Sequence, residues 1–312
     1  MDGRLQVFAG NSSPRLAQAI VSNLEVPLGR AIVGSWKDGE TRVKLEENIR
    51  GSDVFVIQTL CRPVNQHLME LLVILDAVRR ASAARITAVI PYFAYARQEK
   101  KASGREPISA KLVANLLVTA GADRILTLDL HAPAIEGFFD IQVDHLRATP
   151  ILASHFHRLA LPDLVVVSPD AGSVGRAEEF RRRAGGSLAI ITKQRPGPEQ
   201  DEVLEMVGDV EGRHAVIVDD MISSAGTLVR AAEELRARGA ASVRAAAIHG
   251  VFAGDALRLI QASPIEQVVV TDTLPLPDEG PRDKIEVLTV APLIAEAIMR
   301  IHKDLSISAL FT

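Results

Sequence analysis

Short, continuous runs of β-branched and aliphatic residues recur along the chain and constrain its fold more than any other feature. Each run has three to five residues, too few for a helix but enough for a parallel strand that is buried on both faces. The runs lie at 54–57, 86–90, 125–128, 165–167, 188–191, 216–218 and 268–270. Helical patterns at 65–83 and 227–240 lie between them, the second ending near Gly239. This alternation predicts an α/β fold with a doubly wound sheet.

The strand runs form two sets of similar spacing, which suggests a duplicated α/β unit. A chain of 312 residues also exceeds one ordinary core and suits two domains of roughly 150 residues each. The division falls near residues 145–150. We therefore predict domains at 1–147 and 148–312, with a C-terminal tail that packs back on the first domain.

Composition excludes several classes of function. Apolar residues make up 47% and charged residues 24% of the chain, and the net charge is −4. This balance disfavours a nucleic-acid binder. A single cysteine, Cys61, excludes a disulfide framework and fits a reducing compartment. The first residues do not resemble a signal peptide, and no apolar run approaches the ~18 residues of a membrane span. We expect a cytoplasmic protein with no membrane or nucleic-acid partner.

The stretch "AVIVDDMISSAGT" places two acids after an apolar run. Asp219 and Asp220 follow the strand, and the small residues 223–227 then open a helix. The free N–H groups and the dipole at such a helix start suit a phosphate. The carboxylates would not favour the phosphate itself, so we expect them to bind a neighbouring group, either vicinal sugar hydroxyls or a hydrated Mg²⁺. The alternative is that Asp220 belongs to a turn and Ser224 merely caps the helix.

Two further strand ends carry candidate metal ligands. "ILTLDLHAP" places Asp129 and His131 at one, and "VVVSPDAGS" places Asp170 at another. His131 and Asp170 fit Mg²⁺, directly or through water. The alternative for His131 is a hydrogen-bonded histidine at a domain edge. The sequence has no H-E-x-x-H motif, no Cys/His cluster, no G-x-x-x-x-G-K-[ST] and no G-x-G-x-x-G after a strand.

Two polar segments carry cations that suit a polyphosphate. The segment 90–109 holds Arg97, Gln98, Lys100, Lys101 and Arg105, with aromatic residues at 92, 93 and 95 that could stack on a base. The segment 193–201, with two prolines and a glycine, predicts a mobile loop that closes over a reacting phosphate. In both cases the alternative is a solvated basic loop.

Taken in order, "DLHAP", "SPDAGS", "KQRP" and "VDDMISSAGT" closely resemble the ribose-phosphate diphosphokinase (phosphoribosyl pyrophosphate synthetase) family. Further matches, such as "IPYFAYARQ" and "GFFDIQVDHLRATPIL", extend the resemblance over nearly the whole chain. It implies two phosphoribosyltransferase-type domains, each a mainly parallel sheet flanked by helices. It also implies transfer of the β,γ-diphosphoryl group of ATP·Mg²⁺ to the 1-hydroxyl of ribose 5-phosphate. The products are 5-phosphoribosyl 1-diphosphate, for nucleotide, histidine and tryptophan biosynthesis, and AMP.

The resemblance also implies a role for individual residues. The C-terminal domain holds ribose 5-phosphate and the catalytic loop, and the N-terminal domain holds ATP and the contacts of an oligomer, usually a hexamer. The sugar phosphate site comprises Asp219, Asp220, Ser223, Ser224, Ala225, Gly226 and Thr227. The ATP site comprises Trp36, Asp38, Glu40, Arg97, Gln98 and His131, with Trp36, Asp38 and Glu40 reaching the adenine of a neighbouring subunit. The catalytic residues are Lys193, Arg195 and His131, and the Mg²⁺ ligands are His131 and Asp170. A site for phosphate as activator and ADP as inhibitor comprises Arg50, Ser52, Arg80, Ser306 and Ser308.

The sequence departs from the family pattern at a few site positions. Ser223 replaces a common aspartate, Ser173 a common glycine and Trp36 a usual phenylalanine. Gln194 and Gly197 replace arginines that are often found in the catalytic loop. Two alternatives therefore stay open: a non-catalytic regulatory subunit of such an enzyme, and a phosphoribosyltransferase. The first is disfavoured by the intact set of catalytic residues, and the second by the N-terminal half with "YARQ" and "DLHAP".

Overall fold

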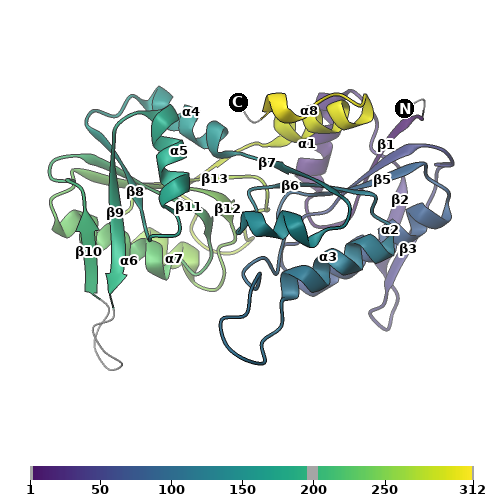
Figure 1. Cartoon of the computed structure of the whole chain (residues 1–312), viewed down its shortest axis with the longest axis horizontal. Coiled ribbons are helices and arrows are strands. Elements are labelled where there is room, and N and C mark those ends of the chain that lie inside the picture. The colour runs from purple at the N-terminus through teal and green to yellow at the C-terminus, as the bar shows by residue number, and fades with distance from the viewer. Residues whose placement is uncertain (1–2, 195–202, 311–312) are drawn as a thin grey trace. The chain divides into compact units, whose positions relative to one another are not determined.

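A computed structural model describes residues 3–194 and 203–310 of the chain (Figure 1). The chain divides into two compact units. The first unit comprises Met1–Arg147, Thr273–Pro275 and Thr289–Thr312, and the second comprises Ala148–Asp272 and Leu276–Leu288. Within the described ranges, no helix combines the length and the apolar character needed to span a membrane.

The first unit is built on a five-stranded parallel sheet in the order β1-β4-β5-β6-β7. Its strands are β1 (Leu5–Ala9), β4 (Asp53–Ile57), β5 (Arg85–Ile90), β6 (Arg124–Leu128) and β7 (Gln142–Leu146). An antiparallel ribbon of β2 (Ala31–Ser35) and β3 (Thr41–Leu45) accompanies it. The helices α1 (Pro14–Leu24) and α8 (Ala291–His302) cover one face, and α2 (Val64–Arg80) and α3 (Ser109–Ala120) cover the other (Figure 1).

The second unit contains a seven-stranded sheet in the order β10-β9-β8-β11-β12-β13-β14. The strands are β8 (Leu164–Ser168), β9 (Ser187–Gln194), β10 (Val203–Val207), β11 (His214–Ile222), β12 (Ser242–Gly250), β13 (Gln267–Thr271) and β14 (Ile285–Leu288). All of them are parallel except β10, which pairs antiparallel with β9. The helices are α4 (Thr149–Leu159) and α5 (Val174–Ala184) on one face, and α6 (Gly226–Ala237) and α7 (Ala256–Ala262) on the other (Figure 1).

The predicted apolar runs become buried strands because helices cover both faces of each sheet. Every residue of β4 and of β8 is buried. In α2, the predicted helical positions Leu71, Leu75 and Val78 are buried. The sequence did not reveal β12, whose centre is "RAAAI", because alanine has little preference for strands.

The central strand β11 is longer than the sequence predicted. The apolar run ends at Val218, but β11 continues through Asp219 and Asp220 to Ile222. On one side it pairs with β12 up to Ile222, whereas on the other its pairing with β8 stops at Ile217. Asp219 and Asp220 therefore lie on the part of β11 that extends beyond the end of β8.

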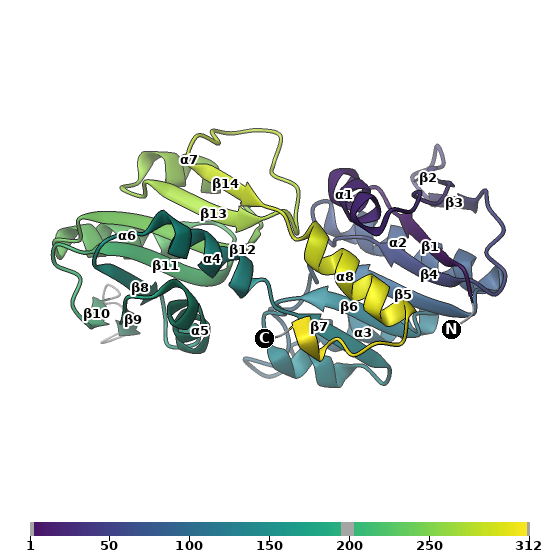
Figure 2. The ribbon, with the colours of Figure 1, turned by 90° about the horizontal axis from the view of Figure 1, so that it is seen from above.

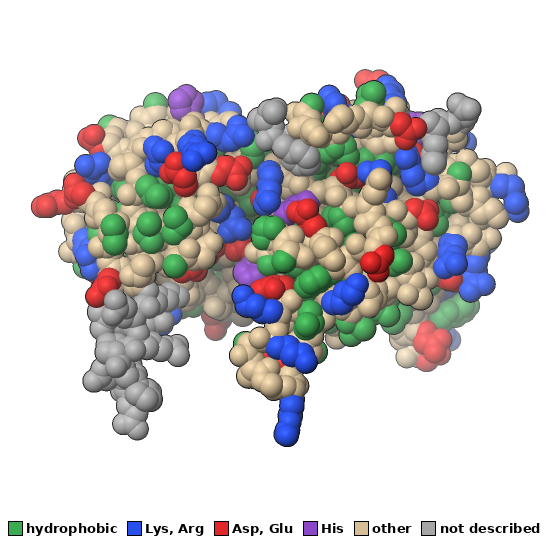
Figure 3. Space-filling view, viewed as in Figure 1, with side chains coloured by type: hydrophobic (Ala, Val, Ile, Leu, Met, Phe, Trp, Pro, Cys, Tyr) green, Lys and Arg blue, Asp and Glu red, His purple; other side chains and the backbone are tan. Residues whose placement is uncertain are grey.

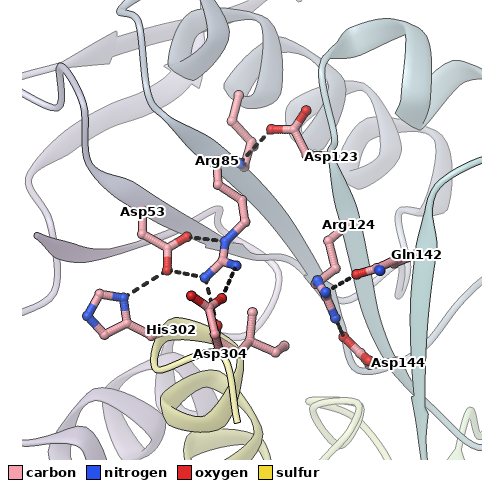
Figure 4. Close-up of polar contacts among 10 residues, drawn as sticks. Asp53, Arg85, Asp123, Arg124, Gln142, Asp144, His302 and Asp304 are labelled. Atoms are coloured by element: carbon pink, nitrogen blue, oxygen red, sulfur yellow. Dashed lines mark hydrogen bonds and ion pairs between the residues drawn. The ribbon is translucent and has the colours of Figure 1, made fainter. Parts of the chain in front are cut away.

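A buried ion-pair network holds the C-terminal helix α8 in the first unit (Figure 4). The guanidinium of Arg85 donates to both carboxylate oxygens of Asp53, at 2.8 and 2.6 Å, and to the carbonyl of Ile301, at 2.7 Å. His302 Nδ1 lies 2.8 Å from Asp53 Oδ2, and Arg85 also pairs with Asp304 at 3.2 Å. Viewed from above, α8 runs beside α1 (Figure 2). The sheet, α1 and α8 therefore form one core.

Replacing Asp53 with alanine is expected to destabilise the first unit strongly. The Asp53 side chain is fully buried, so its loss leaves the charge of Arg85 without its main partner, at a cost of about 3–5 kcal/mol. Asp76→Ala is the matched control, because Asp76 pairs with Arg80 on an exposed helix surface and such pairs contribute about 0–1 kcal/mol. Urea unfolding measures both. Equal losses in the two variants would contradict a structural role for the network.

Candidate active site

Two adjacent carboxylates mark the carboxyl edge of the second sheet. The Asp219 side chain is 28% exposed and that of Asp220 is 6% exposed. In open α/β sheets, ligands bind beyond the carboxyl ends of the strands. Burying two acids side by side is unfavourable without compensating partners. The residues that contact the two carboxylates therefore indicate how the pair is stabilised at this edge.

Arg176 and Ser173 supply these partners, and the sequence pattern did not identify Arg176. Its Nη1 lies 3.7 Å from Asp219 Oδ1 and 3.6 Å from Asp220 Oδ1. The Ser173 hydroxyl donates to Asp219 Oδ1 at 3.1 Å, and the backbone N–H of Asp220 donates to the same oxygen at 2.8 Å. Arg176 comes from α5 and the acids from β11. Only their proximity in the fold reveals the pairing.

Burial, and after it the charge of Asp220, raise the pKa of Asp219 to about 7. Arg176 acts in the opposite direction and lowers the pKa. Near neutral pH Asp219 is therefore only partly ionised, and the carboxyl oxygens of the pair form a surface that still offers hydrogen-bond acceptors. Vicinal sugar hydroxyls, which donate hydrogen bonds, fit such a surface.

The turn after the acids is shaped to present backbone N–H groups. Ala225 adopts the left-handed conformation (φ 63°), and α6 begins at the next residue, Gly226. The Ser223 carbonyl accepts from Ala253 N–H at 2.9 Å, which fixes the turn from outside. The N-cap residue of α6 is Ala225, which makes no side-chain capping hydrogen bond, so the structure does not support the alternative that Ser224 is the N-cap. The first N–H groups of a helix lack intrahelical acceptors and suit a phosphate.

Asp170 follows β8 at the same edge of the second sheet. Its Oδ1 accepts from the backbone N–H of Ser173 at 2.9 Å, and its carbonyl accepts from the Ser168 hydroxyl at 2.7 Å. His131 follows β6 in the first unit, three residues beyond the end of that strand. Across the part of the chain that the structure describes, no three metal-ligating side chains converge.

The loop between β5 and α3 is strongly basic, as predicted, and Figure 3 shows Lys and Arg side chains along its projecting part. Arg97 and Gln98 are exposed at its start. Gln98 Oε1 accepts from the Ser109 hydroxyl at 2.5 Å, which ties the loop to the start of α3.

The prediction for the aromatic residues of this loop was largely wrong. Tyr92 and Phe93 are 8% and 3% exposed, and Phe93 packs edge-on against Phe139 at 6.0 Å. The segment that follows β5 is still buried at these two positions, so both side chains belong to the core of the first unit. Tyr95 is exposed, adopts a left-handed conformation and donates to Asn65. Of the three, only Tyr95 is accessible to a base in this unit.

Trp36, Asp38 and Glu40 form the turn of the β2–β3 ribbon. The Trp36 N–H donates to the Glu40 carbonyl at 2.8 Å, and the Glu40 N–H donates to Asp38 Oδ1 at 3.2 Å. The Trp36 side chain is 53% exposed, and Arg42 lies 4.7 Å above its ring. An exposed tryptophan on a ribbon turn presents a large flat surface for stacking.

The predicted catalytic loop lies only partly within the described residues. Lys193 and Gln194 are not in a loop, because both belong to β9 and pair with β10. Arg195 and Gly197 lie outside the described residues.

The five candidate regulatory residues lie in two places in the first unit. Gly51 and Ser52 exchange backbone hydrogen bonds with Ser82 and Ala84, which brings the loop of Arg50 and Ser52 next to the end of α2, where Arg80 lies. Ser308, close to Ser306, lines a cavity of about 500 Å³ with Arg124, Glu136, Asp144 and His145. Ser52 is buried, whereas Arg50 and Arg80 are exposed.

Comparison with known proteins decides the family. Residues 5–121 match the N-terminal domain of ribose phosphate pyrophosphokinase, and residues 189–312 match a phosphoribosyl synthetase-associated domain. The ribose-phosphate pyrophosphokinase of Caldanaerobacter subterraneus subsp. tengcongensis is 54% identical over 99% of this chain and 98% of its own length. The chain belongs to the ribose-phosphate pyrophosphokinase family. The corresponding protein of Clostridium acetobutylicum is 52% identical over 98% of this chain and 97% of its own length.

The fold comparison agrees with this family. The crystal structure of phosphoribosylpyrophosphate synthetase from Mycobacterium smegmatis superposes with a TM-score of 0.91 at 42% identity, over 96% of this chain and 99% of that chain. The predicted fold class, two phosphoribosyltransferase-type domains with mainly parallel sheets, is confirmed.

The raised pKa of Asp219 predicts a pH-dependent effect on stability. In the unfolded chain this carboxyl titrates near 3.8, whereas in the folded chain its pKa is about 7. Between these values the folded state binds more protons, so ionisation of Asp219 lowers stability as the pH rises through this window. Asp219→Asn removes this loss. The melting temperature of the variant minus that of the wild type should therefore increase from pH 4 to pH 8.

Asp209→Asn, at an exposed position, controls for the general effect of removing one negative charge. A difference for Asp219→Asn that stays constant or shrinks with pH would show that the carboxylate is not destabilised by burial.

Proposed function

We propose that this member of the family is a ribose-phosphate diphosphokinase that transfers the β,γ-diphosphoryl group of ATP to ribose 5-phosphate. The observation that carries the proposal is the arrangement of residues at the carboxyl end of β11. There, two carboxylates held by Arg176 and Ser173 precede a turn whose backbone N–H groups open α6. The regulatory-subunit alternative would not require this site to be intact.

In the proposed complex the turn 223–227 binds the 5-phosphate, chiefly through backbone N–H groups. Asp219 and Asp220 accept hydrogen bonds from the ribose hydroxyls and orient the sugar. Ser223, which replaces the common aspartate, retains its carbonyl contact to Ala253. The turn therefore keeps its backbone support without the extra carboxylate.

For ATP we propose a site formed by Arg97, Gln98 and His131, completed by Trp36, Asp38 and Glu40 of a neighbouring subunit. The exposed Trp36 ring suits the adenine, and Arg97 suits the phosphates. His131 and Asp170 would hold Mg²⁺, which supplies neutralising charge to the phosphates when bound. Consistent with the family, we propose a cytoplasmic homohexamer.

The reaction follows from these positions. The 1-hydroxyl oxygen of the sugar attacks the β-phosphorus of ATP, and the bond from that phosphorus to the α,β-bridging oxygen breaks and releases AMP. Such a transfer depends on alignment and charge neutralisation more than on a strong base. Lys193 and Arg195 are the cations that we propose for neutralising the charge that develops on the transferred group.

We further propose that phosphate and ADP act as activator and inhibitor through Arg50, Ser52, Arg80, Ser306 and Ser308. Support comes from the adjacent loop and helix end that carry Arg50 and Arg80, and from the cavity that Ser308 lines.

Product analysis tests the proposed function. The purified protein is incubated with ATP and Mg²⁺, with and without ribose 5-phosphate, and the nucleotides are separated by chromatography. We expect AMP only when the sugar is present, in equal amount to 5-phosphoribosyl 1-diphosphate. If no AMP forms although either substrate binds, the chain is a regulatory subunit. If neither substrate binds, the proposed sugar site is wrong.

Lys193→Ala is expected to lower kcat by at least about 100-fold while the KM for ATP changes little, because its cation acts mainly on charge that develops in the transition state. The control is Lys44→Ala on β3 of the first unit, which should be close to wild type. Steady-state kinetics with ATP as the varied substrate distinguish the two outcomes. Equal losses in kcat and in ATP affinity would assign Lys193 to ground-state binding.

A further inference from the structure

The turn that carries His131 is held in place by residues at the end of β7. Asp129, the first residue after β6 in this turn, adopts a left-handed conformation (φ 37°) and is almost fully buried. For a residue other than glycine such a conformation is unfavourable and persists only when the surroundings impose it. The contacts that impose it indicate which residues position His131.

Three successive residues, the last two of β7 and the residue that follows it, make these contacts. The Asp129 N–H donates to the Leu146 carbonyl at 3.0 Å. Arg147 Nη1 lies 3.8 Å from Asp129 Oδ1. The backbone N–H of Leu130, the residue just before His131, donates to Nε2 of His145 at 2.7 Å.

The contact from Leu130 fixes the protonation state of the His145 ring. Because Nε2 accepts a hydrogen bond, it carries no proton, and the neutral ring must carry its proton on Nδ1. Nδ1 faces the carboxylate of Glu136, which is within hydrogen-bonding distance. A carboxylate, an imidazole and a backbone N–H thus form a chain from the half-exposed η1 segment (Pro133–Phe138) to the residue that precedes His131.

The edge strand that carries His145 is itself anchored. Arg124 on β6 donates to Asp144 Oδ2 at 2.6 Å and also binds Gln142 (Figure 4). These contacts fix β7 against β6 from the residues on either side of Val143. The His145 side chain is only 4% exposed, so it has little freedom to move away from Leu130.

We propose that His145, oriented by Glu136, is a positioning residue for His131. It holds the Leu130 N–H so that the following residue points its imidazole toward nucleotide and Mg²⁺. This inference rests on the proposed function, in which His131 contacts both. Partners that orient a ligand in this way typically change metal affinity or activity by 10–100-fold when removed.

A paired substitution at position 145 separates positioning from simple packing. His145→Leu fills similar space but cannot accept from Leu130, whereas the amide oxygen of His145→Gln can reach the position of Nε2. We expect His145→Leu to lower kcat, or to raise the Mg²⁺ concentration for half-maximal rate, by about 10–100-fold. The KM for ribose 5-phosphate should stay within about twofold, and His145→Gln should recover most of the loss.

His214→Leu is the matched control. His214 is a half-buried strand histidine whose Nδ1 lies 2.7 Å from the Ser242 hydroxyl, at the amino end of the second sheet. It should leave kcat and the Mg²⁺ requirement close to those of the wild type. Equal losses in the leucine and glutamine variants at position 145, or a parallel rise in the KM for ribose 5-phosphate, would overturn the proposal.

A spectroscopic measurement tests the geometry independently of activity. At pH 8, ¹⁵N chemical shifts of the His145 ring should show a protonated Nδ1 and an unprotonated Nε2, and Glu136→Leu should weaken this preference. A protonated Nε2 would overturn the proposal even if the enzyme is active. If the wild type forms no AMP but the ring shows the expected tautomer, the proposed function fails while the contact stands. Glu136→Leu also serves if His145→Leu does not fold.

Discussion

Parallel strand pairing is the constraint on which the rest of this structure depends. Parallel neighbours cannot be joined by tight hairpins, so most of their connections cross over through a helix and the sheet is covered on both faces. This explains why β4 and β8 are buried along their whole length. It also brings the carboxyl ends of the parallel strands to one edge, where Asp170 and the pair Asp219–Asp220 lie together in the second unit.

The acids at that edge are maintained against an energetic cost. Burial and mutual repulsion disfavour the ionised form of Asp219, as its raised pKa shows. Arg176 lies within 3.7 Å of both carboxylates, and Ser173 donates to one of them. Ser173 was notable in the sequence only as a replacement for glycine. In the structure its hydroxyl and its N–H bind Asp219 and Asp170, so it connects the sugar-binding and metal-binding candidates.

Sequence patterns predicted well where one strong physical signal dominates. Apolar runs gave most of the parallel strands, and the small residues after Asp220 gave the turn that opens α6. Weaker signals failed. The alanine-rich strand β12 lacks β-branched residues, and the aromatic pair Tyr92–Phe93 looked accessible in a polar loop but is packed in the core. Charge in a strand was interpreted as its end, yet β11 continues to Ile222 because β12 still pairs with it there.

The sequence by itself therefore determined the fold class, the family resemblance and the identity of the residues at the strand ends, because periodicity and local motifs are properties of neighbouring residues. Only the tertiary structure decided which distant groups meet. Arg176 reaches β11 from α5, Asp53 binds both Arg85 and His302, which lies 249 positions away in the chain, and His145 binds Leu130 from an adjacent strand. Such contacts arise when whole helices and strands pack together, so patterns among neighbouring residues in the sequence cannot predict them.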